Sequence, residues 1–125
     1  MQTQSRSSMQ EAPTRLLPVD VWQRLLSHLL DRHYGLTLHD TPFGNDGVIQ
    51  EHIDTGISLC NAVNFIVEKY DLVRTDRRGF NAEKQSPLIS SIDILRARKV
   101  TGLMTRNSDK AVTDITAGRY REVQP

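Results

Sequence analysis

The sequence predicts an α+β fold that is mainly helical, with four helices, a short β-hairpin and flexible tails at both ends. Three observations lead to this prediction. Four stretches place apolar residues three or four positions apart between capping residues, prolines and glycines, which is typical of amphipathic helices. The stretch "LVRTDRRGF" instead has β-prone residues on either side of a polar turn. Residues 1–16 are rich in Gln, Ser and Thr, and apolar residues thin out after residue 104. We therefore expect a flexible arm (1–16), a single compact domain (17–104) and a loose tail (105–125).

The first two predicted helices have clear ends. "LLPVDVWQRLLSHLLDRHYG" contains Pro18, which suits a first helical turn, and ends at Gly35, which can take a left-handed stop. Its apolar stripe contains Trp22 and four leucines. In "GVIQEHIDTG", Asn45 or Asp46 can cap the start, and Gly56 ends the helix.

The third predicted helix, "LCNAVNFIVEKY", is capped by Ser58 and leaves one aromatic residue outside its apolar stripe. The stripe holds Leu59, Ala62, Val63, Ile66, Val67 and Tyr70. Phe65 falls about 100° from the nearest edge of that stripe, among Asn61, Glu68 and Lys69. A single exposed apolar residue is common, and Phe65 could also pack under a terminal segment. Alternatively, it is the anchor of a protein interface, where one aromatic ring concentrates the binding energy.

The last predicted helix, "PLISSIDILRARKVTG", begins at Ser86 and Pro87 and stops at Gly102. Its spacing predicts an inner side formed by Leu88, Ile89, Ile92, Leu95 and Val100.

Composition excludes several classes of protein. Sixteen Lys and Arg against fifteen Asp and Glu give a net charge of +1, whereas a general nucleic-acid binder needs a basic surplus. The lone Cys60 excludes an intrachain disulfide and fits a reducing compartment. No apolar run approaches the length of a membrane span, and the first residues lack a secretory signal pattern. We therefore expect a cytoplasmic protein that does not associate with membranes.

The sequence marks no catalytic residue, cofactor site or metal site. His28 and His33 are five positions apart, whereas a helix-borne zinc pair is four apart. His39, His52 and Cys60 lie on separate elements without a paired ligand motif. "TPFGNDG" lacks the spacing and the lysine of a phosphate-binding loop.

The arginine-rich stretch "VRTDRRGF" keeps two other functions open. A helix followed by a basic hairpin is the arrangement of a winged-helix nucleic-acid binder, with the third helix reading bases through Asn61, Asn64 and Glu68. A small ribonuclease-type toxin could use Lys69, Arg74, Arg77 or Arg78 to stabilise phosphate charge. A solvated turn is the simplest interpretation.

Three long stretches carry a resemblance to a known family. "HYGLTLHDTPF", "ISLCNAVNFIVEKYDLVRTDRRGF" and "SIDILRARKVTGLM" closely resemble the CbtA/YeeV family of toxins from type IV toxin–antitoxin systems, which includes the YkfI and YpjF paralogues. The resemblance extends from about Pro18 to Met104, across nearly the whole predicted domain.

The resemblance implies binding rather than catalysis. Toxins of this family bind the cytoskeletal proteins FtsZ and MreB and block their polymerisation, so that cells lose division and rod shape. The cognate antitoxin acts on the filaments rather than by sequestering the toxin. The resemblance associates Phe65 with FtsZ and Arg15 with MreB, and Asn61, Asn64 and Glu68 flank Phe65 in a partner-binding surface. It therefore favours the anchoring role of Phe65 over the two alternatives.

Overall fold

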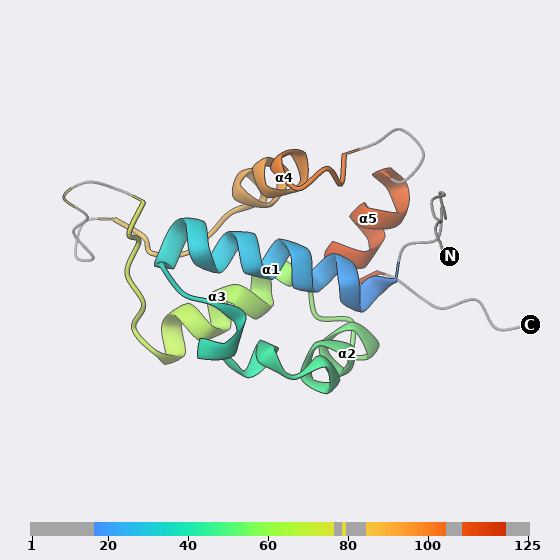
Figure 1. Ribbon diagram of the computed structural model, residues 1–125, viewed down its shortest axis with the longest axis horizontal. Coiled ribbons are helices and arrows are strands. Elements are labelled where there is room, and N and C mark those ends of the chain that lie inside the picture. The colour runs from blue at the N-terminus through green and yellow to red at the C-terminus, as the bar shows by residue number, and fades with distance from the viewer. Residues whose placement is uncertain (1–16, 77–78, 80–84, 105–108, 120–125) are drawn as a thin grey trace, which may run out of the picture.

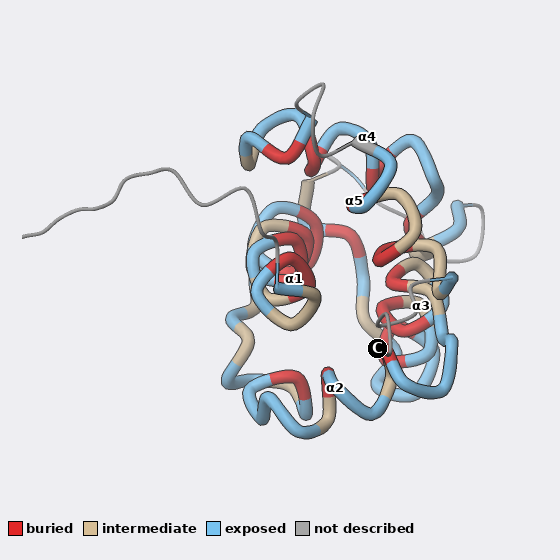
Figure 2. The backbone as a smooth tube through the Cα atoms, turned by 90° about the vertical axis from the view of Figure 1, so that its right-hand side faces the viewer, coloured by how far each residue is buried: buried red, intermediate tan, exposed pale blue. Residues whose placement is uncertain are grey.

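Five α-helices and two short 3₁₀ helices form the part of the chain that our computed structural model describes, which is residues 17–76, 79, 85–104 and 109–119. In chain order these elements are α1 (Pro18–Tyr34), η1 (Leu38–Asp40), η2 (Pro42–Gly44), α2 (Asp46–Asp54), α3 (Leu59–Lys69), α4 (Ser91–Val100) and α5 (Asp109–Thr116). α1 runs through the middle, with α4 on one side of it and α2 on the other (Figures 1 and 2). No helix in these ranges is long and apolar enough to cross a membrane.

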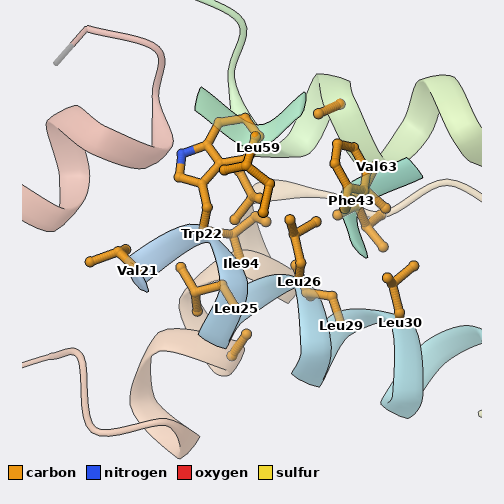
Figure 3. Close-up of a cluster of buried hydrophobic side chains, with 14 of the residues drawn as sticks. Val21, Trp22, Leu25, Leu26, Leu29, Leu30, Phe43, Leu59, Val63 and Ile94 are labelled. Carbon is orange, nitrogen blue, oxygen red and sulfur yellow. The ribbon is translucent and has the colours of Figure 1, made fainter. Parts of the chain in front are cut away.

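The central helix, α1, buries the stripe that its sequence predicts. The side chains drawn from it in Figure 3 point into the core between α1 and the neighbouring elements. Five of them have no exposed surface, namely Trp22, Leu25, Leu26, Leu29 and Leu30. Gly35 ends the helix at a φ of 68°, and its N–H donates to the carbonyl oxygens of Leu30 and Asp31. The predicted left-handed stop is therefore confirmed.

The predicted caps of α2 and α3 are also confirmed. The Asn45 side chain accepts a hydrogen bond from the Gly47 N–H, and the Ser58 hydroxyl accepts one from the Asn61 N–H. The apolar stripe of α3 is buried from Leu59 to Val67, but Tyr70 lies just past the helix end and is exposed. Each cap satisfies an N–H that the first turn leaves unpaired, and so fixes where the helix starts.

The predicted β-hairpin is wrong, because the described part of the chain contains no strand. Arg77, Arg78 and Phe80 lie outside the described residues, while residues 72–74 form an irregular segment. Arg74 is only 3% exposed, whereas its neighbour Val73 is half exposed. The Arg74 guanidinium donates from Nε and Nη2 to the two Asp76 carboxylate oxygens, at 2.9 and 2.8 Å, and from Nη1 to the Leu88 carbonyl at 3.2 Å. A buried arginine whose three guanidinium nitrogens all donate hydrogen bonds therefore stands where strand pairing was expected.

The Arg74–Asp76 pair also fastens this segment to α1. His33 Nδ1 lies 2.7 Å from an Asp76 oxygen and 3.0 Å from Arg74 Nη2. The Thr75 N–H donates to the His33 carbonyl at 2.8 Å. The Tyr34 hydroxyl donates to the Pro87 carbonyl at 2.5 Å, which brings the segment before α4 to the same end of α1.

The prediction of only four helices and a loose C-terminal tail is wrong as well, because α5 lies in that tail. Its Val112 and Ile115 are fully buried, and the Trp22 indole N–H donates to the Ile115 carbonyl at 3.2 Å. At the end of α5, Gly118 takes a φ of 77° against the turn between α2 and α3. A Cβ added there would lie 2.4 Å from the Gly56 carbonyl oxygen. Only two large apolar side chains mark this short helix, so periodicity alone could not reveal it.

The inner side predicted for α4 is also wrong. The helix starts at Ser91, behind a capping box in which the Asp93 carboxylate accepts from the Ser90 N–H at 3.0 Å. Leu88 and Ile89 lie before the first residue of the helix. They therefore do not share a helical side with Ile92 and Leu95, contrary to the prediction from the sequence. The side facing the core carries Asp93, Ile94, Ala97 and Arg98. Ile92, Leu95 and Val100 face away from it, at 57%, 47% and 69% exposed.

We predict that Asp76→Asn destabilises the protein by about 3 kcal/mol at neutral pH, because it leaves the buried Arg74 with a weakened partner. The hydrogen bonds from Arg74 hold the pKa of Asp76 well below its usual range. A carboxyl with a lowered pKa stabilises the fold above its unfolded pKa of about 4, and this contribution is lost as the pH falls toward the folded value. The variant should therefore lose less stability on acidification than the wild type, as measured by urea unfolding at each pH.

The matched control is Asp114→Asn, because Asp114 pairs with the exposed Lys110 at 2.8 Å. This exposed pair, together with the longer contact of Asp114 with Arg119 at 3.4 Å, should contribute far less to stability than the buried cluster. Equal losses for the two variants would show that the buried cluster does not stabilise the fold as we describe.

We predict that Gly118→Ala costs about 3 kcal/mol, since it adds a clash with the Gly56 carbonyl to the strain of a positive φ. Gly102→Ala, at a φ of 80° with nothing within 4 Å, should cost only the strain of about 1 kcal/mol. Thermal unfolding of both variants measures the difference, and similar values would mean that α5 does not close against the α2–α3 turn.

Candidate docking surface around Phe65

Phe65 is exposed on the outer side of α3, as the helical periodicity predicts. Its side chain keeps 62% of its surface accessible, while Ile66 and Val67 beside it are buried. The Lys69 ammonium lies 5.8 Å from the centre of the Phe65 ring and 5.6 Å from that of Tyr70. The cation therefore sits between two exposed aromatic rings, at a distance where it is attracted to both.

A small apolar hollow lies next to the Phe65 ring. It has a volume of about 170 Å³. Its lining comes from η2, α2 and α3, and consists of Pro42, Phe43, His52, Phe65, Ile66, Lys69 and Tyr70. Such a hollow beside an exposed ring can take an apolar side chain from a partner protein.

The floor of this hollow is held rigidly. Phe43 is buried, and its ring meets the His52 ring edge-on with centres 5.3 Å apart. His52 Nδ1 lies 2.7 Å from the Val48 carbonyl oxygen. The Thr41 hydroxyl accepts from the Phe43 N–H at 3.2 Å and donates to the Leu38 carbonyl at 2.8 Å, which fixes η2. A fixed floor lowers the entropy that binding would cost.

Of the other residues predicted to contact a partner, two lie beside Phe65 on the outer side of α3. Asn61 and Glu68 are exposed and stand four positions before and three positions after Phe65, so they share its row. Asn64 is half-buried: its amide donates to the Ile89 carbonyl at 3.1 Å and accepts from the Ile89 N–H at 2.8 Å. Asn64 thus ties α3 to the segment before α4. Arg15 lies outside the described residues.

Tyr70 and Pro42 also lie next to Phe65, although the sequence pattern predicts neither as its neighbour. Tyr70 fits the predicted buried stripe, but the helix ends at Lys69 and the ring turns outward. Pro42 belongs to the turn-rich stretch "TPFG", far from Phe65 in the sequence, and the fold brings it to the same hollow as Phe65. No local pattern could have placed either residue next to Phe65.

Among the described residues, the two basic side chains considered for nucleic-acid binding or cleavage are already engaged in contacts within the protein. Arg74 is buried in its ion pair, Lys69 covers two rings, and Arg77 and Arg78 lie outside the described residues. Cys60 is half-buried and burial raises the pKa of its thiol, which disfavours a reactive thiolate. Across the described ranges, no three His, Cys, Asp or Glu side chains are close enough to hold a metal ion.

Comparison with known proteins decides the family. Residues 20–95 match the family model described as CbtA toxin of the type IV toxin–antitoxin system, which is more than half of the chain. The chain belongs to the CbtA toxin family. It is 62% identical over 115 residues to a protein named cytoskeleton-binding toxin CbtA from Escherichia coli strain K12, covering 92% of this chain and 93% of that protein. Toxin CbtA from E. coli O6:H1 strain CFT073 matches with the same identity and coverage. No solved structure matches this member of the CbtA family.

We predict that Phe65→Ser changes the free energy of unfolding by no more than about 0.5 kcal/mol, because the ring is mostly exposed. The matched control is Phe43→Ser, which removes a ring that is 1% exposed and should cost at least about 3 kcal/mol. Urea unfolding measures both. A large loss for Phe65→Ser would mean that the ring supports the fold and not a docking surface.

Proposed function

We propose that this chain is the toxin of a type IV toxin–antitoxin system that binds FtsZ and MreB and blocks their polymerisation. Cell division and elongation would then stop together. The observation that carries the proposal is the exposed Phe65 ring beside a preformed apolar hollow. Membership of the CbtA family and the name of its relative, a cytoskeleton-binding toxin, support it.

The Phe65 surface has the size and chemistry of a small protein interface. Burying a phenylalanine ring contributes about 1.5–3 kcal/mol, and a single anchor of this kind can dominate a modest interface. Asn61 and Glu68 border the ring, and Asn64 holds the underlying helix in place. A polar border around an apolar centre is the usual anatomy of a protein interface. We assign this surface to FtsZ and the contact of Arg15 to MreB.

The mechanism that we propose is stoichiometric capping. A protein of 14.2 kDa bound to the surface that the next subunit needs stops the filament from growing. No covalent bond has to break, so inhibition should follow occupancy and not incubation time. GTP hydrolysis by FtsZ should fall in parallel, because its hydrolysis site is completed only between subunits. An antitoxin that acts on the filaments could then oppose the toxin without binding it.

We predict that Phe65→Ser raises the concentration needed to inhibit FtsZ sedimentation by about tenfold or more, the factor expected for losing 1.5–3 kcal/mol. MreB sedimentation should remain inhibited. Arg15→Cys should give the opposite result. GTP turnover measured on the same FtsZ samples should recover together with sedimentation.

The matched control is Val73→Ser, which removes another half-exposed apolar side chain outside the Phe65 surface. It should inhibit both polymers as the wild type does. If Phe65→Ser still inhibits FtsZ fully, the ring is not the anchor. If inhibition grows with time at substoichiometric toxin, the protein acts as an enzyme and capping is wrong.

A further inference from the structure

The outer side of α4 combines exposed apolar and cationic residues. Ile92, Leu95 and Val100 are 57%, 47% and 69% exposed. Arg96 and Lys99 are exposed too. At 100° per residue, these five positions fall within an arc of about 140° on one side of the helix. We call this set of five residues the α4 surface.

The contacts on the inner side of α4 fix this orientation. Ile94 and Ala97 are buried in the core. Asp93 lies 3.7 Å from Arg74 and caps the helix through the Ser90 N–H. Arg98 donates to the Thr113 hydroxyl of α5 at 3.1 Å. Rotating the helix to bury Ile92 and Leu95 would break these contacts and expose Ile94. The apolar residues are therefore held outward by the fold.

A cavity of about 390 Å³ adjoins the α4 surface, between α4 and α1. Four cationic residues (Arg32, Arg74, Arg96, Lys99) and two carboxylates (Asp76, Asp93) are among those that line it. The lining thus has a surplus of two positive charges, while the whole chain has a surplus of one. Positive charge is concentrated at this place.

The cationic side chains at the mouth of the cavity are available to a partner. Among the described residues, Arg32, Arg96 and Lys99 make no ion pair, whereas Arg74 is bonded to Asp76 and lies close to Asp93. Burial, assisted by the charges of His33 and Arg32, lowers the pKa of His28 in the same wall. An incoming carboxylate would meet unpaired cations, and arginine binds a carboxylate with two parallel hydrogen bonds.

The mixture of residues selects the kind of partner. Nucleic acid would use the cations and leave three large apolar side chains facing water or phosphate. An acidic protein face with apolar residues between its carboxylates matches both parts of the surface. The cavity next to Arg96 can receive an acidic side chain, while Leu95 and Ile92 pack against apolar ones.

We propose that the α4 surface is a second docking surface, which binds an acidic, partly apolar face of a filament subunit independently of Phe65. The Phe65 surface borders η2 and α2, and α4 lies across α1 from α2 (Figures 1 and 2). The inference rests on the function proposed above, in which FtsZ and MreB need separate surfaces. Because the Phe65 surface is assigned to FtsZ, the α4 surface is assigned to MreB, in addition to the contact of Arg15 proposed above.

The test compares the full-length wild type with Arg96→Glu/Lys99→Glu and with Leu95→Ser in sedimentation assays of MreB and of FtsZ. The charge reversal should raise the concentration for half-inhibition of MreB by about tenfold or more, and Leu95→Ser by about threefold or more. Inhibition of FtsZ should stay within about twofold of the wild type. Titration of monomeric MreB by calorimetry should give the same ranking and show binding that weakens with salt, less steeply for the charge reversal.

The matched control is Arg24→Glu, an exposed arginine of α1 that does not line the cavity, and it should leave both polymers inhibited as in the wild type. Full inhibition of MreB by the charge reversal overturns the inference and leaves the proposed function standing. A further outcome is that the variants unfold at the same urea concentration as the wild type and yet lose inhibition of both polymers equally. That result overturns the separation of the two surfaces. A wild-type protein that leaves MreB assembly unchanged contradicts the proposed function, and this inference with it.

Discussion

The packing around α1 is the constraint on which the rest of the structure depends. α1 contacts each of the other four α-helices, and its large apolar side chains are completely enclosed. Because this one helix provides the common core, each short helix around it needs to bury only one side. The opposite sides of α3 and α4 are left free, and that is where Phe65 and the α4 surface lie. The arrangement separates the residues that hold the fold from those offered to partners.

Polar contacts decide which side each outer helix turns outward. Burying Arg74 is costly unless all its donors are used, so Asp76, the Leu88 carbonyl and α1 are held in one geometry. Asn64 adds two hydrogen bonds to Ile89, directly before the cap of α4. Hydrogen bonds from α1, from Arg74 and from α3 therefore all reach the same segment, residues 87–89. The segment that leads into α4 is thus held by side chains outside the helix, and the contacts of Asp93 and Arg98 hold the helix itself.

Local sequence predicts the parts of this fold that local physics determines. α1 and α3 have caps and long apolar stripes, so their extents and the exposure of Phe65 follow from periodicity. The apolar side of α4 was misassigned because Leu88 and Ile89 continue the helical spacing, although Asn64 and Arg74 hold their backbone outside the helix. The β-prone residues on either side of a polar turn predict the hairpin, whereas the burial of Arg74 against Asp76 and Leu88 is a tertiary event that no local pattern shows. α5 has too few apolar positions to be recognised without Trp22. The neighbours of Phe65 likewise come from distant elements.

The contact between Lys69 and Phe65 partly shields the exposed ring in the free protein without preventing the ring from binding a partner. An exposed cation–π contact contributes about 0.5–1 kcal/mol, and Lys69 shares its charge between Phe65 and Tyr70. Burying the same ring in a partner contributes about 1.5–3 kcal/mol, so displacing the ammonium does not prevent docking. Until then the charge stands over two aromatic rings that would otherwise attract other apolar surfaces. Because Lys69 lies one turn beyond Phe65, its stem can pack beside the ring while the ammonium turns to water or to a partner carboxylate. The surface thus favours a partner that buries the ring completely over one that only touches it.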